Sequence, residues 1–227
     1  MFDQRSSFSV YAAAVTLAGF FLCSTGCTTY SKIVPFAEYS EAITVERPLL
    51  GEIQNTEIRK LLENAEEQLS LTTGYSQDYY AISYPNGDVP IETGACTDVV
   101  VRAFRNAGTD LQKEVHEDMR ANFNAYPKKW GLKKPDTNID HRRVPNLQTY
   151  FTRKGKSLAI SSEGGNYMPG DVVSWELDDR GTTHIGLVSN RWNSAEGRYL
   201  IIHNIGRGVR LEDRLFEWKI TGHFRYF

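Results

Sequence analysis

The sequence predicts an α+β domain, with helices in the first part of the chain and an antiparallel sheet in the second. Between residues 55 and 154, apolar residues recur at the spacing of one buried helical face, most clearly at Val99, Ala103 and Phe104. After residue 157, short runs rich in β-branched residues are separated by turns of Gly, Asp and Asn. Helices followed by strands along the chain are typical of α+β proteins.

Length and composition set the broad class of protein. The chain has 227 residues, of which 41% are hydrophobic and 24% are charged, and this is enough for one domain with its own core. The net charge of −2 gives no reason to expect a nucleic-acid partner. We expect no cofactor and no metal ion.

The N-terminal segment, residues 1–26, is typical of a bacterial signal peptide. Arg5 precedes an apolar run from residue 8 to residue 22, and three small residues, Ser24, Thr25 and Gly26, follow it. The apolar run is shorter than a membrane-spanning helix requires. Because a cysteine directly after small residues resembles a lipobox, we expect Cys27 to be lipidated and to begin the mature protein.

Lipidation of Cys27 would anchor the protein to a membrane. Thr28 follows it and no aspartate retention signal is present, so the expected location is the periplasmic face of the outer membrane. The alternative is an ordinary cleaved signal peptide, which would give a soluble periplasmic protein. Residues 27–54 are then a tether, and residues 55–227 are the folded domain.

Start and stop residues place the predicted helices. The first begins near Asn55 and ends near Thr73, and a loop rich in tyrosine occupies residues 75–92. The second helix runs from Cys96 to Ala107 and stops at Gly108. Two more helices are expected over residues 110–119 and in a short amphipathic stretch that ends at Lys154.

Turn residues place the predicted strands. Each run of strand-forming residues ends at a cluster such as Asp178-Asp179-Arg180-Gly181 or Asn193 to Gly197. The expected strands form an antiparallel meander over residues 158–161, 172–177, 183–188, 198–203 and 220–227.

Cys96 opens the second predicted helix, with Thr93 as its expected N-cap. Unpaired backbone N–H groups and the positive end of the helix dipole lie in a first helical turn, and both favour a thiolate. Cys23 falls in the signal peptide and Cys27 would carry lipid, so Cys96 is the one free thiol in an oxidising compartment. The alternative interpretation is a small, buried hydrophobic residue.

A cysteine nucleophile needs a base that takes its proton and a third group that orients the base. His184 and His203 fall in neighbouring predicted strands joined by the turn at Asn193 to Gly197. If these strands pair, the two imidazole rings are neighbours on one face. The alternative for either residue is a histidine whose hydrogen bonds are satisfied within the core.

Other polar residues are candidates for substrate contacts. Tyr84, in the loop before Cys96, is a candidate for stabilising an oxyanion. Asp98 either binds a substrate amine or favours the helix dipole. A run of ionisable residues in a predicted loop is either a solvated edge or, because Arg binds carboxylates through two hydrogen bonds, a carboxylate site: Asp140, His141, Arg142 and Arg143.

Four motifs in this order resemble those of the NlpC-type papain-like cysteine peptidases. They are Gly94-Ala95-Cys96-Thr97-Asp98, Pro169-Gly170-Asp171-Val172-Val173, His184-Ile185-Gly186-Leu187-Val188 and Ile201-Ile202-His203. From about Tyr75 onward, the chain more closely resembles the bacterial domain of unknown function 1287. The segments that carry this second resemblance are residues 138–143 and 203–206, which include Asp140, His141 and Asn204.

The resemblance implies a papain-like fold and an amide hydrolase. Cys96 would be the nucleophile, His184 the base and His203 the orienting residue. The backbone N–H of Cys96, with help from Tyr84, would hold the oxyanion. The usual NlpC pattern at the nucleophile is Asp-Cys-Ser-Gly, from which this chain departs, so detailed substrate preference does not carry over.

For a lipid-anchored enzyme in the periplasm, the expected substrate is the peptide stem of peptidoglycan. Its free carboxylates would bind Arg142 and Arg143, with Asp140, His141 and Asn204 also at the substrate site. The sequence leaves open which amide bond is cut and whether an activating protein is needed.

Two other functions remain open from the sequence. A papain-like domain can hold cell-wall peptides without cutting them. Alternatively, Cys96, His184 and His203 can be zinc ligands, although their spacing lacks the close ligand pairs that are common in zinc sites.

Overall fold

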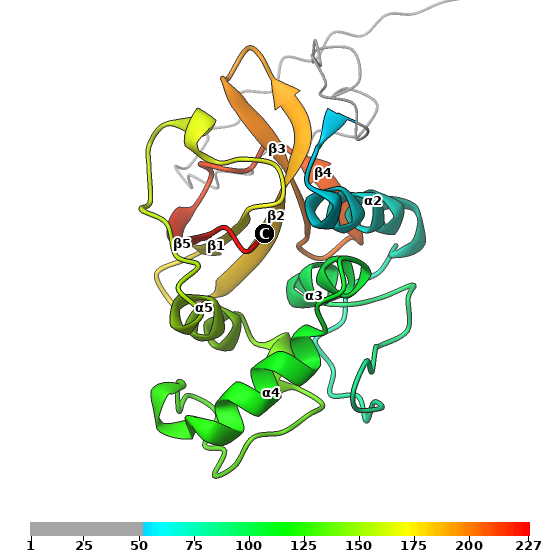
Figure 1. Cartoon of the computed structure of the whole chain (residues 1–227), viewed down its shortest axis with the longest axis vertical. Helices are drawn as coiled ribbons and strands as arrows, with labels where there is room; N and C mark the ends of the chain where they lie inside the picture. Colours follow the sequence, from blue (N-terminus) through cyan, green and yellow to red (C-terminus); the bar gives the residue numbers. More distant parts are fainter. Residues whose placement is uncertain (1–51) are drawn as a thin grey trace, which may run out of the picture. The chain divides into compact units, whose positions relative to one another are not determined.

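The computed structural model describes residues 52–227, and Figure 1 shows how their helices and strands are arranged. The predicted signal peptide, Cys27 and almost all of the predicted tether lie outside the described residues. Helices precede strands along the described chain, so the predicted α+β class is confirmed. Among the described residues, no helix is both long enough and apolar enough to span a membrane.

The α-helices of the described chain all precede the sheet. They are α2 (Thr56–Leu71), α3 (Cys96–Asn106), α4 (Leu111–Ala121) and α5 (Val144–Arg153), with 3₁₀ turns at η2 (Phe123–Ala125), η3 (Asp140–Arg142) and η4 (Gly164–Asn166). Asn55 is the N-cap of α2, because its Oδ1 accepts hydrogen bonds from the N–H groups of Glu57 and Ile58. The helices predicted from apolar spacing are therefore confirmed to within about two residues at each end.

Five strands form one antiparallel sheet in the order β4-β3-β2-β1-β5. Strands β1 to β4 follow one another as a meander, and β5 returns to pair with the other edge of β1. The pairing of β1 with β2 sets Trp175 opposite His184, and the pairing of β3 with β4 sets His203 opposite Arg210. The strand bounds are Val172–Glu176, Thr183–Asn193, Arg198–Asn204, Val209–Glu212 and Lys219–Phe224, from β1 to β5.

The sheet differs from the prediction at its edges. Residues 158–161 form no strand, and the chain nearby makes only an isolated bridge between Ser157 and Phe224. Strand β4 was not predicted, because it has only four residues and follows a turn in which Gly206 and Gly208 both have positive φ. This short strand supplies Glu212, which is important below.

Helix α3 is the best-buried helix and packs against both α2 and β2 (Figure 1). The side chains of Val99, Val100 and Phe104 are fully buried. The ring centroid of Phe104 lies 5.6 Å from that of Phe151 in α5 and 5.3 Å from that of Tyr226 near the C-terminus. These contacts fix the start of α3, and therefore Cys96, relative to the sheet.

One side chain of α3 also holds the segment that leads into it. Arg102 Nε lies 2.9 Å from the carboxylate of Asp88, and the other guanidinium nitrogens donate hydrogen bonds to Thr72 Oγ1 and to the carbonyls of Val89, Pro90 and Thr93. Because this buried guanidinium has acceptors on every side, the chain before Cys96 follows a defined path.

Candidate active site

Cys96 is the first residue of α3, as predicted, but the helix is capped differently. The N-cap is Ala95, and the carboxylate of Asp98 reaches back to accept a hydrogen bond of 2.6 Å from the Ala95 N–H. Gly94 has φ +155°, and a Cβ at that position would lie 3.1 Å from Asp98 Cβ. Thr93 is therefore not the cap, because Asp98 takes that role and Gly94 leaves room for it.

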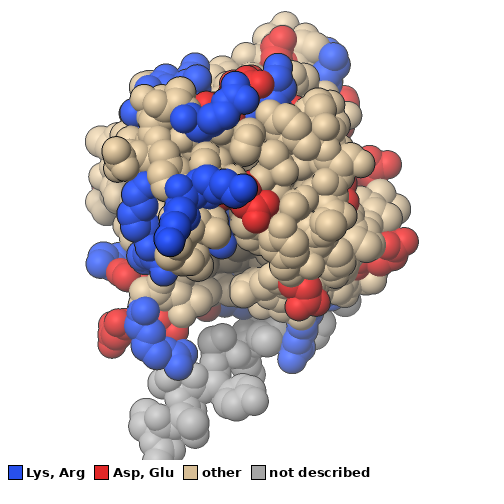
Figure 2. Space-filling model, turned by 90° about the horizontal axis from the view of Figure 1, so that it is seen from below, with Lys and Arg blue, Asp and Glu red and all other residues tan. Residues whose placement is uncertain are grey.

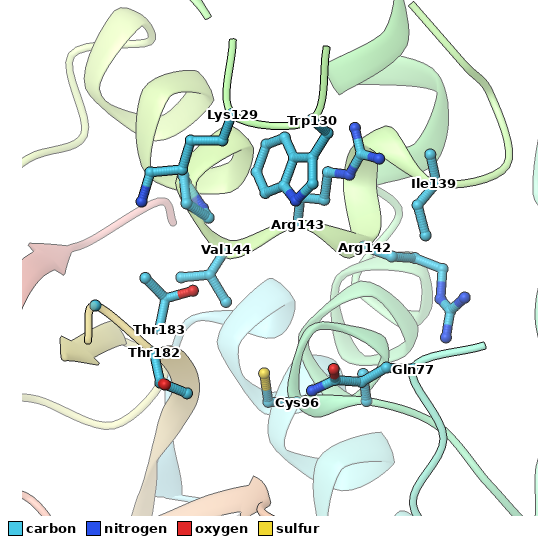
Figure 3. A pocket seen from close by; sticks show the side chains of 13 residues that line it. Gln77, Cys96, Lys129, Trp130, Ile139, Arg142, Arg143, Val144, Thr182 and Thr183 are labelled. Atoms are coloured by element: carbon cyan, nitrogen blue, oxygen red, sulfur yellow. The ribbon is translucent and has the colours of Figure 1, made fainter. Parts of the chain in front are cut away.

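A cavity of about 450 Å³ opens above the sulfur of Cys96. In Figure 3, Cys96 lies at its floor, and Gln77 points its amide toward the sulfur from one side. Thr182 and Thr183, at the start of β2, form another side, while Trp130 stands across the cavity from Cys96. A cavity of this size is in the range that accepts a small ligand or a short peptide.

The thiol of Cys96 is not a thiolate in the resting protein. Burial raises the pKa of Cys96 to about 12, and the nearby Asp98 carboxylate adds to the increase. The backbone N–H groups of Ile185, Thr97 and Cys96 itself lower the pKa, but they do not offset burial. The predicted effect of the helix N-terminus is therefore present, although it is outweighed because only 5% of the residue is exposed.

His184 and His203 are brought together, as the sequence predicted. His184 Nε2 lies 2.7 Å from His203 Nδ1, and His203 Nε2 lies 3.0 Å from Oε2 of Glu212. Both imidazoles are buried, and the ring of His184 packs against those of Trp175 and Trp218, with centroids 5.7 Å away in each case. Three side chains from β2, β3 and β4 thus form one hydrogen-bond chain.

The carboxylate of Glu212 determines which nitrogens of this chain carry protons. Burial raises the pKa of Glu212, but His203 and Arg214 more than offset this and hold the pKa below its usual value. An ionised carboxylate only accepts hydrogen bonds, so His203 Nε2 is the donor toward it. In the tautomer in which His203 Nδ1 accepts from His184 Nε2–H, the lone pair of His184 is left at Nδ1.

His184 is neutral at physiological pH. Burial, followed by the electrostatic effect of His203, lowers the pKa of His184 well below its ordinary value. The next residue along β2, Ile185, packs in the core beneath the helices and reaches the sulfur of Cys96 through its N–H. Within the described residues, no hydrogen bond joins Cys96 to His184 directly. The resting pair is therefore a neutral thiol and a neutral imidazole on neighbouring elements.

Arg142 and Asp98 bind each other. Arg142 Nε lies 2.8 Å from Asp98 Oδ1 and its Nη2 lies 3.0 Å from Oδ2, and both side chains are almost fully buried. The remaining donors of Arg142 reach the carbonyls of Asp78 and Ser76. Each of these two residues already has its ionic partner inside the fold, and Arg142 also lines the cavity, so their expected substrate contacts stay a prediction. Asp98 lies in the first turn of α3, where the alternative role of favouring the helix dipole applies. Together the two residues position the start of α3 and the segment that carries Gln77.

The other ionisable residues of this segment lie in different environments. Asp140 and His141 are buried and do not line the cavity, so their expected role at the substrate site is not supported. Burial, followed by the charge of Arg142, lowers the pKa of His141 to about 3, which makes it a neutral core histidine. Arg143 does line the cavity, as expected of a substrate-binding residue.

The sequence comparisons identify the family of the chain. The model of the domain of unknown function DUF1287 matches residues 62–226. The chain belongs to the DUF1287 family. It is also 47% identical over 197 residues to the uncharacterized protein YijF of Escherichia coli (strain K12), a match that covers 87% of this chain and 95% of that protein. The resemblance of residues 75 onward to this family is confirmed.

In this DUF1287 protein, Tyr84 is not at the site. Its side chain is 40% exposed and its ring packs edge-on against His116, with centroids 5.2 Å apart. Tyr75, in the same loop, is the tyrosine near the sulfur: burial raises its pKa, and the electrostatic effect of Cys96 raises it further. Tyr75 Oη accepts a hydrogen bond from the amide of Gln77. Sequence proximity alone did not separate these tyrosines.

Asn204 has a structural role instead of the expected substrate contact. Its Nδ2 donates hydrogen bonds of 2.9 Å to the carbonyls of Gly74 and Gly94, and its side chain is fully buried. Asn204 thereby ties the end of β3, next to His203, to the residues just before Cys96. It positions two parts of the site against each other.

Two residues of the DUF1287 site were missed from the sequence. Gln77 lies in a loop with no periodic pattern, and nothing in its neighbourhood singles it out. Glu212 had no clear signal either, because only the first and last of the four residues from Val209 to Glu212 are buried, and such a strand shows no alternation. Within the described residues, no group of three or more His, Cys, Asp or Glu side chains is arranged to hold a metal ion.

Proposed function

We propose that this DUF1287 protein is a cysteine hydrolase that cleaves an amide bond in the peptide stems of peptidoglycan. The observation that carries the proposal is the hydrogen-bond chain from Glu212 through His203 to His184, beside a free thiol at the start of α3. A cysteine at a helix N-terminus, packed on an antiparallel sheet that carries two histidines, also supports a papain-like fold of the NlpC type.

In the proposed reaction, the sulfur of Cys96 attacks the carbonyl carbon of the amide while Nδ1 of His184 takes the thiol proton. The N–H of Cys96 and the amide of Gln77 hold the oxyanion. His184 then gives its proton to the leaving amine as the C–N bond breaks, which leaves a thioester on Cys96. Water attacks the thioester, and His184 passes a proton from the water to the sulfur as the carboxylic acid departs.

The opposite pKa shifts of Cys96 and His184 fit this sequence of events. Because burial disfavours both the thiolate and the imidazolium, the proton moves only when a substrate is in place. The contact between sulfur and imidazole is expected to tighten at the same time, since catalytic hydrogen bonds are often long before substrate binds. His203 and Glu212 stabilise the imidazolium that forms for a moment on His184.

The proposed location follows from the N-terminal segment. Export by the signal peptide and lipidation of Cys27 would place the domain at the periplasmic face of the outer membrane, within reach of peptidoglycan. Without lipidation, the protein would be soluble in the periplasm and would meet the same substrate.

The test is digestion of purified peptidoglycan by the wild-type protein and by Cys96→Ala, with the soluble fragments identified by mass spectrometry. Fragments released by the wild type alone support the proposal, and their masses identify the bond that is cut. Equal release by both proteins contradicts the assignment of Cys96 as nucleophile. Circular dichroism of the variant controls for folding.

A second candidate function is binding of peptidoglycan without cleavage. The buried thiol with its raised pKa favours this alternative, because such a thiol is a weak nucleophile until a base acts on it. If neither protein releases fragments, co-sedimentation of Cys96→Ala with insoluble peptidoglycan tests the binding function directly.

A further inference from the structure

The wall of the cavity across from Cys96 carries positive charge that the fold neutralises only in part. The charged residues that line the cavity are Lys129, Arg142 and Arg143, and no Asp or Glu side chain is among them. Arg142 is paired with Asp98. Lys129 and Arg143 therefore remain as the cations that face a bound molecule, and Figure 3 shows both beside the indole of Trp130.

Arg143 is held in place by stacking and leaves its donors unused. Its guanidinium carbon lies 4.2 Å from the centroid of the Trp130 ring. The nearest carboxylate oxygen is Oδ1 of Asp140, and at 3.9 Å from Nη1 it is beyond hydrogen-bond distance. Within the described residues, the guanidinium makes no hydrogen bond, although only 15% of the side chain is exposed. A stacked guanidinium keeps its N–H edge available for an acceptor in its own plane.

The backbone around Arg143 makes this arrangement rigid. Arg143 is the N-cap residue of α5, between the buried residues Arg142 and Val144. The carbonyl of Arg142 accepts a hydrogen bond from Thr97 Oγ1 in the first turn of α3. The cationic wall and the nucleophile are therefore joined through one short connection, and their relative positions are fixed.

Lys129 belongs to a basic segment on the same side of the cavity. Residues 128–134 contain four lysines around Trp130. Within the described residues, Lys129 has no ion-pair partner, whereas the amine of the adjacent Lys128 donates to the carbonyl of Phe123. In the view from below in Figure 2, Lys and Arg side chains gather over the left and upper parts of the face, while much of the right part is uncharged.

We propose that Arg143, Trp130 and Lys129 form a subsite for a free carboxylate, so that the protein selects amide substrates that carry a carboxylate across the cavity from the cleaved bond. This inference rests on the proposed hydrolase function and names the chemical group that its substrate must present. Arg143 binds the carboxylate through two parallel N–H donors, and Lys129 adds a second, more mobile cation. Asp140 balances part of the charge, which leaves a net charge near +1 that suits one carboxylate.

The experiment measures binding in the Cys96→Ala background, where no turnover occurs. The probes are the tripeptide L-Ala-γ-D-Glu-meso-diaminopimelate and the same tripeptide with its carboxylates converted to primary amides, each titrated by calorimetry. We expect the acid to bind at least about 10-fold more tightly than the amide, the loss typical of one charged hydrogen-bonded pair. In Arg143→Gln, this ratio should fall close to one.

Two further variants keep the test decisive. Lys113→Gln removes one positive charge from the exposed surface of α4, outside the cavity, and should leave the ratio unchanged. Arg143→Lys keeps the charge but not the planar fork, so an intermediate ratio is expected even if Arg143→Gln folds poorly. A ratio near one with Arg143 intact, no measurable binding of the acid, or a ratio that survives Arg143→Gln overturns the subsite. Digestion by the wild type reports separately on the hydrolase.

Discussion

His203 Nε2 lies 3.0 Å from Oε2 of Glu212, so a carboxylate binds the imidazole of His203 on the side away from His184. The relationship joins β3 to β4 and gives the hydrogen-bond chain a direction, with the acceptor at one end and the free lone pair of His184 at the other. Trp218 lies over both imidazoles, with centroids 5.7 Å from His184 and 6.1 Å from His203. An arrangement that excludes water in this way strengthens each hydrogen bond in the chain.

We expect Glu212→Gln to lower the rate of peptidoglycan fragment release by about 10-fold or more, with a smaller effect on substrate affinity. The glutamine amide can donate as well as accept, so it no longer fixes the protonation of His203 and His184. The measurement is the initial rate of fragment release across pH 5 to 9. Glu163→Gln is the matched control, because Glu163 is an exposed carboxylate that takes no part in the hydrogen-bond chain. Equal rates for Glu212→Gln and the wild type would contradict the orienting role.

Alkylation of Cys96 by iodoacetamide at pH 7.5 should be at least about 10-fold slower than alkylation of a cysteine in an unfolded peptide. The reason is that burial raises the pKa of the thiol to about 12, so very little thiolate is present. The rate should continue to increase above pH 9, where a free cysteine has levelled off. Peptide mass mapping distinguishes Cys96 from Cys23 and Cys27. Rapid alkylation at neutral pH would indicate a thiolate that is already formed.

Asp98→Asn should destabilise the protein by about 3 kcal/mol, because the buried guanidinium of Arg142 loses its counter-charge. The change shows as a lower midpoint of unfolding in urea. Glu176→Gln is the comparison: Glu176 pairs at 2.8 Å with Lys219, whose side chain is 75% exposed, and the loss should be below about 1 kcal/mol. Similar midpoints for the two variants would show that the buried Asp98–Arg142 pair contributes no more to stability than the exposed Glu176–Lys219 pair.

Asp140 should make stability depend on pH in the direction opposite to most carboxylates. Burial raises the pKa of Asp140 to about 6, whereas an unfolded aspartate titrates near about 3.9. Between these values the folded protein binds more protons at this side chain, so its contribution to stability falls as pH rises. As the pH rises from 4 to 7, the free energy of unfolding of Asp140→Asn should therefore increase by about 2 kcal/mol relative to that of the wild type, as measured by urea unfolding. A difference that is constant with pH would count against the raised pKa.

Much of the fold could be predicted because its signals are local. The apolar face of α3 and the glycine that ends the helix both lie within about a dozen residues of sequence. The pairing of His184 with His203 follows from one short turn between two strands. Strand β4 escaped prediction because four residues are too few for an alternating pattern to stand out. Its pairing with β3 is decided by tertiary packing, as is the position of Glu212.

The errors at the site have a common physical origin. Arg142 was expected on a solvated edge or at a substrate, and its pairing with Asp98, which lies 44 positions earlier, was not foreseen. Tyr84 was chosen for its position just before Cys96, but the loop carries it away toward His116. Sequence spacing says little about where an irregular loop points its side chains, since such loops are shaped by contacts that are distant along the chain.

The ion pair between Asp98 and Arg142 also restricts how this protein can evolve. The two residues are 44 positions apart, yet an uncharged side chain at either position alone would leave an unpaired charge in the interior. A lineage can exchange the pair only by passing through a poorly folded ancestor or by changing both codons together. Descendants that keep the site are therefore expected to inherit residues 98 and 142 as a single unit.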